Sequence, residues 1–67
     1  METNTYELVL TYGDGSRDVA MVAVADVASI MMISRGWLRS AAGAVSVRCC
    51  GVDGDGHPTG VVCEYVL

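Results

Sequence analysis

Strict alternation of side-chain types near the start of the chain limits the fold more than any other feature. The segment 5–12, TYELVLTY, predicts a strand with one buried face, which carries Tyr6, Leu8, Leu10 and Tyr12. The dipeptide Asp14-Gly15 follows, and both of its residues accept the backbone angles of a two-residue hairpin turn. The segment 17–24, RDVAMVAV, then predicts the returning strand.

The register of this first hairpin follows from the position of the turn. A register symmetric about Asp14-Gly15 pairs Leu10 with Val19. It also adds Val19 and Met21 to the buried face. Val22 then points to the opposite face.

A helix is expected after this hairpin. Asp26 is suited to cap its first turn, because a carboxylate there accepts from unpaired backbone amides. Gly36 is expected to end the helix, with Trp37 following the cap. One helical face carries Val27, Ile30, Met31, Ser34 and Leu38.

Two further alternating segments, 44–50 and 60–67, predict a second hairpin. One register sets the apolar residues of both strands on a common face, with Val45 opposite Leu67, Val47 opposite Tyr65 and Cys49 opposite Cys63. The same register sets Arg48 opposite Glu64 on the other face, which is a favourable cross-strand pair. A shift by one residue would mix the two faces.

The expected fold is therefore a single α+β domain over residues 1–67, with the order ββαββ. It consists of a four-stranded antiparallel sheet with the single helix packed on one face. A chain of 67 residues is small for an independent core, so it is expected to need a dense core or a partner.

The charge balance disfavours one class of function. Eight acidic residues stand against four arginines, lysine is absent, and the net charge is −4. A nucleic-acid-binding protein would carry a basic stripe. The longest apolar run, 19–33, contains Asp26 and falls short of the roughly 20 residues that span a bilayer. Three cysteines, an odd number, suit reduced thiols, so we expect a cytoplasmic protein.

A calcium loop is the first metal site to consider. Asp53, Asp55 and Glu64 occupy positions 1, 3 and 12 of such a loop. His57 is a poor calcium ligand, however, and Pro58 replaces the required glycine. The segment is better interpreted as a polar hairpin loop.

Zinc and catalysis are disfavoured on similar grounds. Cys49 and Cys50 are adjacent, so on a strand they point to opposite faces and cannot both join His57 and Cys63 as ligands. The same histidine is the only one in the chain and lies on a loop, and a chain of this size with one helix is expected to lack a sizeable pocket. We therefore expect no metal, no cofactor and no enzymatic activity.

Two surfaces are candidates for binding a protein. The first is acidic, and its charges would cluster if both hairpin loops lay at one end of the sheet. It could then meet a basic surface, although an ordinary solvated surface would look the same. Its residues are Glu7, Asp14, Asp18, Asp53, Asp55 and Glu64.

The second candidate is the sheet face that points away from the helix. This face is more apolar than a solvated face needs to be, so it could form a homodimer or bind a partner. Scattered exposed valines would equally need no explanation. Its residues are Val9, Thr11, Val22, Ser46, Val62 and Val66, with Cys50 on the same side.

The overall profile resembles the small inhibitors that phages encode, anti-CRISPR proteins among them. The resemblance covers the whole chain and consists of small size, acidity and the absence of motifs. It implies a non-catalytic protein that blocks a basic, nucleic-acid-binding host effector in the host cytoplasm. The alternative is a small structural or assembly subunit that dimerises through its valine-rich face.

Overall fold

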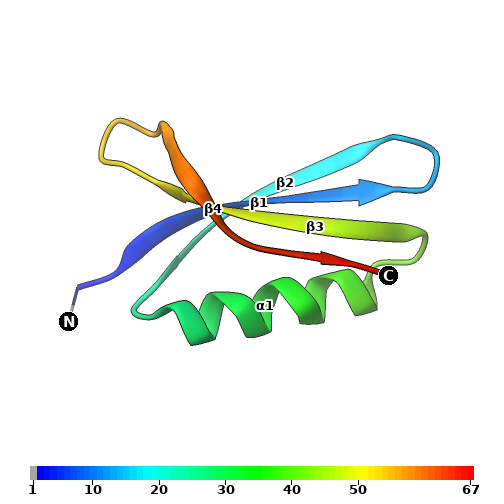
Figure 1. The fold of residues 1–67 in the computed structure, drawn as a ribbon, viewed down its shortest axis with the longest axis horizontal. Helices are drawn as coiled ribbons and strands as arrows, with labels where there is room; N and C mark the ends of the chain where they lie inside the picture. Colours follow the sequence, from blue (N-terminus) through cyan, green and yellow to red (C-terminus); the bar gives the residue numbers. More distant parts are fainter. Residues whose placement is uncertain (1) are drawn as a thin grey trace.

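The computed structural model describes residues 2–67 and contains one sheet and one helix (Figure 1). This confirms the predicted order ββαββ. The elements are β1 (Asn4–Tyr12), β2 (Arg17–Val24), α1 (Val27–Ser40), β3 (Ala44–Val52) and β4 (Pro58–Val66).

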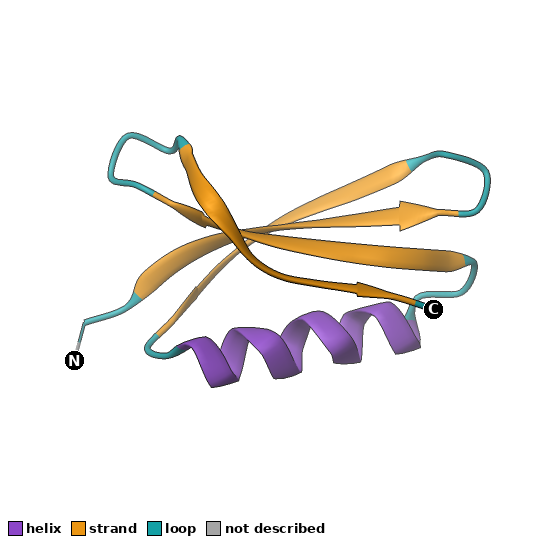
Figure 2. Ribbon diagram, viewed as in Figure 1, coloured by secondary structure: helices purple, strands orange, loops and turns teal. Residues whose placement is uncertain are grey.

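The strands form a single sheet in the order β2-β1-β3-β4, and every neighbouring pair is antiparallel. The central strands are therefore β1 and β3, while β2 and β4 form the edges. The helix lies along one face of the sheet (Figure 2). Among residues 2–67 no element covers the opposite face, which we call the open face.

The core lies between the helix and the central strands. Leu8, Leu10 and Val47 are fully or almost fully buried on the sheet side, and Ile30 is buried on the helix side. Ser34 is also buried, and its hydroxyl donates to the carbonyl oxygen of Ile30 at 2.7 Å. This bond satisfies a polar group that would otherwise be costly to bury.

The predicted register of the first hairpin is wrong by one residue. Leu10 pairs with Asp18, which leaves Val19 and Met21 on the open face, 60% and 53% exposed. The turn contains three residues instead of two: the amide of Gly15 donates to the carbonyl of Tyr12, and Gly15 has φ +90°. A type I turn followed by a left-handed glycine is the usual three-residue hairpin. The extra residue inverts the faces of β2.

The predicted register of the second hairpin is confirmed at its centre. Val47 pairs with Tyr65, Cys49 with Cys63 and Arg48 with Glu64. Leu67 lies beyond β4, but its amide donates to the carbonyl of Val45 at 2.9 Å, which continues the same register. Closer to the loop, the pairing shifts twice.

The helix begins where it was predicted and ends later. Asp26 caps it, and its carboxylate accepts from the amide of Ser29 at 2.7 Å. Gly36 does not end the helix, which continues to Ser40, so that prediction is wrong. The last turn brings Leu38 into the core, and this burial outweighs the low helix propensity of a glycine.

Candidate functional site

The open face is built as an ordered array because the three strand registers align side chains across the sheet. Residues directly opposite each other in neighbouring strands point to the same side. The rows, each from β2 to β4, are Arg17-Thr11-Ser46-Val66, Val19-Val9-Arg48-Glu64 and Met21-Glu7-Cys50-Val61.

A shallow hollow occupies the middle of the open face. It is lined by Val9, Thr11, Arg17, Ser46, Arg48 and Glu64. Within it the Nε of Arg48 donates to the Oε2 of Glu64 at 2.9 Å, as the sequence predicted. The face carries two arginines and two glutamates, so its charges balance. It therefore suits contact with a weakly charged surface better than contact with a basic one.

The four valines predicted on the open face differ in where the structure places them. Val9 and Val66 lie there, and Val66 is 74% exposed. Val22 does not, because it pairs with Tyr6 and packs against the core. Val62 falls at a shift of register, since Cys49 pairs with Cys63 and the next residue pairs with Val61. It is the extra residue of this irregularity, outside the rows.

The six acidic candidates do not form one cluster. The turn between β1 and β2 and the loop between β3 and β4 lie at opposite ends of the sheet (Figure 1), because the central strands are antiparallel. The condition for a shared acidic end is therefore not met. Asp14 and Asp18 lie at one end, Asp53 and Asp55 at the other. The remaining two, Glu7 and Glu64, lie on the open face between them.

Asp14 and Asp18 line a second hollow beside the first turn. The hydroxyl of Tyr12 donates to the Oδ2 of Asp18 at 2.6 Å, and this bond raises the pKa of the tyrosine. The carboxylate of Asp14 accepts from the hydroxyl and the amide of Ser16, which lowers its pKa. Both carboxylates thus have structural partners within the hairpin.

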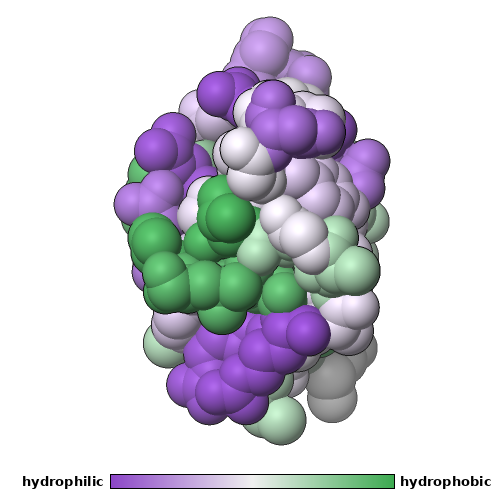
Figure 3. All heavy atoms as spheres, turned by 90° about the vertical axis from the view of Figure 1, so that its right-hand side faces the viewer, coloured by the Kyte–Doolittle hydropathy of each residue, from purple (hydrophilic) through white to green (hydrophobic). Residues whose placement is uncertain are grey.

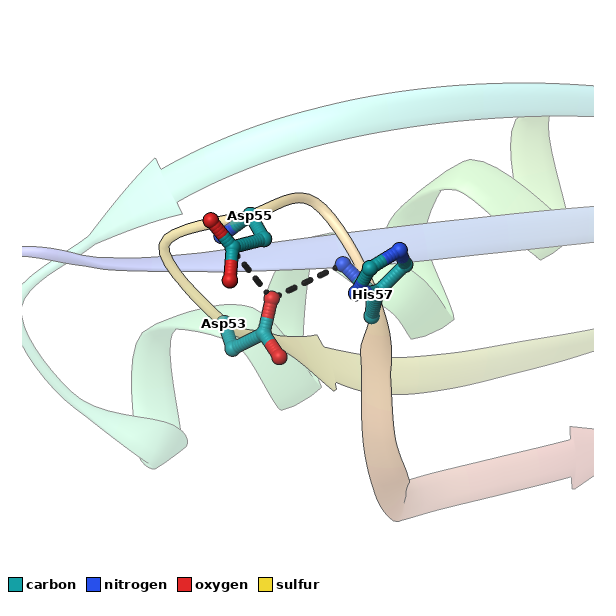
Figure 4. Close-up of side chains that lie close together, drawn as sticks. All are labelled: Asp53, Asp55 and His57. Atoms are coloured by element: carbon teal, nitrogen blue, oxygen red, sulfur yellow. Dashed lines mark hydrogen bonds between the residues drawn. The ribbon is translucent and has the colours of Figure 1, made fainter.

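The other acidic end is a compact loop (Figure 4). One carboxylate oxygen of Asp53 accepts from the amides of Asp55 and His57, at 3.0 and 2.9 Å. One ligand atom from each of these three exposed side chains falls within 4.8 Å of the others. Glu64, the twelfth position of a calcium loop, is paired with Arg48 instead. The hydrogen bonds of Asp53 shape a turn of the kind that aspartate favours.

The cysteines occupy two environments. Cys49 is fully buried, and burial raises the pKa of its thiol to about 11. Cys63 lies opposite it and its Sγ is 4.0 Å from the hydroxyl of Ser34. Cys50 is half-buried on the open face, and all three thiols are free. Since a raised pKa suppresses the thiolate, Cys49 is a packing residue.

The end of the molecule that holds the first turn carries a hydrophobic patch bordered by hydrophilic atoms (Figure 3). The exposed apolar residues at this end of β3 and β4 are Val45, Val66 and Leu67. Val66 belongs to the open face, whereas Val45 and Leu67 are on the helix side of the sheet, because side chains alternate along each strand. Exposed apolar side chains are therefore present on both sides of the sheet at this end.

Sequence reasoning missed four residues of the open face: Val61, which reaches it through the register shift beside Val62, and three residues of β2. Arg17, Val19 and Met21 reach this face only through the three-residue turn. The segment RDVAMVAV carries apolar residues at both odd and even positions, so either face of β2 could have been buried. One signal in the sequence could have predicted the correct register: Gly15, the last residue of the GDG segment, also fits the left-handed position of a three-residue turn.

Comparison of the chain with protein-family models, with curated proteins and with solved structures finds no match. Within residues 2–67, α1 is too short to cross a bilayer as a helix.

Proposed function

We propose that this chain is a non-catalytic binding protein that acts by covering a surface of a protein partner, with its open face as the contact surface. The observation that carries this proposal is the exposure of apolar side chains on a sheet face that no other element of residues 2–67 covers. Exposed apolar surface of this kind favours contact with another protein.

The charges of the open face support the same proposal. Arg48 and Glu64 satisfy each other, so this pair presents little net charge to a partner. A charge pair that is already formed adds specificity through its shape and polarity while costing less to cover. Val9 beside it and Val66 at its rim supply apolar contact area.

An inhibitor that works through acidic loops is the second candidate. It is favoured by the loop at residues 53–57, in which Asp53 and Asp55 are exposed. The loop itself contains no arginine that could neutralise these two carboxylates. Such a loop would meet a basic surface of a nucleic-acid-binding effector, as the resemblance to anti-CRISPR proteins implies. Because the acidic residues are divided between two opposite ends of the sheet, an inhibitor of this kind would contact its partner through only one of the two loops.

Affinity capture from a host lysate with matched variants separates the two candidates. Val66→Arg changes the open face, and the pair Asp53→Asn with Asp55→Asn neutralises the loop. We expect the first change to abolish capture of the partner and the second to preserve it. The opposite pattern would favour the acidic-loop inhibitor. Capture of the partner that survives both changes would contradict binding through the open face and binding through the loop. Circular dichroism of each variant controls for folding.

A further inference from the structure

The outer edge of β2 is a row of backbone groups that no strand of residues 2–67 pairs with. The amide of Tyr12 donates to the carbonyl of Ser16 at 2.9 Å, so these two residues form a hydrogen-bonded pair across β1 and β2. Hydrogen-bonded and non-hydrogen-bonded pairs alternate along an antiparallel ladder. The register has no shift, so the even-numbered residues of β2 bond to β1. The odd-numbered residues direct their amides and carbonyls outward.

This edge lacks the features that normally protect an edge strand. Proteins usually blunt such edges with charges, prolines or bulges. The other edge strand, β4, has them: it begins at Pro58 and its pairing with β3 shifts twice. After Arg17 and Asp18, β2 has no charged residue, no proline and no irregularity.

We propose that β2 pairs with β2 of a second copy of this chain, joining the two sheets edge to edge in a symmetric dimer. One register uses all four outward residues. It sets Val19 of one copy opposite Met21 of the other, and Arg17 of one copy opposite Ala23 of the other. The two-fold axis then passes beside Ala20, whose small side chain allows close approach. The dimer goes beyond the proposed function and does not depend on it.

The charge distribution favours a second copy at this position. Two chains with a net charge of −4 repel each other on most surfaces. The middle of β2 carries no charge, and the proposed register places no two like charges opposite each other. On the open face, Val19 and Met21, 60% and 53% exposed in the single chain, would meet their counterparts at the axis.

The helix carries an exposed apolar side chain on the side that is directed toward β2. Arg35 lies over the ring of Tyr65 at 5.7 Å, which shows which side of α1 faces β4. Ile33 precedes Arg35 by two residues, about 200° around the helix, so it lies toward β2. It is 39% exposed. In the dimer both helices lie on the same side of the joined sheet, and the Ile33 side of each helix is directed toward the shared edge.

Sedimentation equilibrium over a range of concentrations tests this proposal. The unmodified chain should approach twice the 7.0 kDa mass of one chain as the concentration rises. Met21→Pro removes an outward amide without disturbing a bond to β1, because proline is accepted at edge positions whose amide faces outward. This variant should keep its circular dichroism spectrum and sediment as a monomer. Val66→Arg, on the opposite edge of the same face, should remain dimeric.

Two results would overturn the dimer through β2. One is a monomeric mass for the unmodified chain at millimolar concentration, which would leave the edge free for a strand of a different protein. The other is a doubled mass that persists in Met21→Pro. If that variant fails to fold, Met21→Lys serves in its place, since an exposed lysine on an edge strand opposes pairing without restricting the backbone.

Discussion

Arg48 on β3 and Glu64 on β4 lie directly opposite each other, and the Nε of Arg48 donates to the Oε2 of Glu64 at 2.9 Å. The pair and the buried apolar face favour the same register of the second hairpin, because a shift by one residue would separate the two charges and bring apolar residues to the open face. It also removes Glu64 from the ligands available to the neighbouring loop.

A double-mutant cycle measures this pair. Arg48→Ala, Glu64→Ala and the double variant should give a coupling free energy of about 0.2–1 kcal/mol at low salt, since both side chains are substantially exposed. The coupling should decrease as salt is added. Arg39→Ala with Asp55→Ala is a matched control without an ion pair and should be additive. A cycle with no coupling at low salt would contradict the pairing.

Glycine substitutions test the corrected end of the helix and the corrected turn. Gly36 lies inside α1, and an added Cβ would meet nothing within 4 Å. Gly36→Ala should therefore raise the free energy of unfolding by about 0.5–1 kcal/mol in urea denaturation. Gly15→Ala should lower it, because Gly15 has φ +90°. A loss of stability in Gly36→Ala would mean that the helix ends at Gly36.

The helix cap predicts a dependence on acid. The amide of Ser29 donates to the carboxylate of Asp26, which holds the pKa of this group below its ordinary value of 3.8. A depressed pKa in the folded state stabilises the fold above that ordinary value, and the contribution is lost as the pH falls through the folded-state pKa.

Two substitutions at Asp26 separate the cap from its charge. Asp26→Ala should cost about 1 kcal/mol at pH 7 in thermal or urea unfolding. Asp26→Asn retains a cap and should lose much less, while showing a weaker fall in stability below pH 4 than the unmodified chain. Equal stability of Asp26→Ala and the unmodified chain at pH 7 would contradict the capping role.

The thiols should react in a defined order. With its pKa raised to about 11, Cys49 has roughly a thousandth of its population as thiolate at pH 8, and it is fully buried. Iodoacetamide should therefore label Cys50 first and Cys49 only after unfolding, as peptide mass spectrometry would show. Cys50→Ser should remove the fast phase. Rapid labelling of Cys49 in the folded chain would contradict its burial.

The raised pKa of Cys49 also predicts behaviour at high pH. The folded state keeps this proton at pH values where the unfolded chain has released it. The contribution to stability is therefore complete below the ordinary thiol value of 9.0 and lost as the pH rises toward about 11. The melting temperature should fall less steeply over this range in Cys49→Ala than in the unmodified chain, and an unchanged slope would contradict the assignment.

Local patterns predicted the elements and one of the two hairpin registers. The Arg48–Glu64 pair could be found from the sequence because only one register satisfies both faces of its hairpin. The first hairpin has no such pair, and its apolar residues suit either face, so the conformation of Gly15 decides the register. Whether Asp14 and Asp53 share an end depends on the order of the strands. Strand order follows from the path of the chain through the helix, which periodicity does not encode.

Amide hydrogen exchange along β2 tests most directly whether this edge is a contact surface. The amides of Ala20 and Val22, which bond to β1, should exchange slowly at every protein concentration. Those of Val19 and Met21 point outward, so they should exchange slowly only at high concentration and become fast on dilution, in parallel with the fall in sedimenting mass. Fast exchange of Val19 and Met21 at all concentrations would contradict pairing through β2.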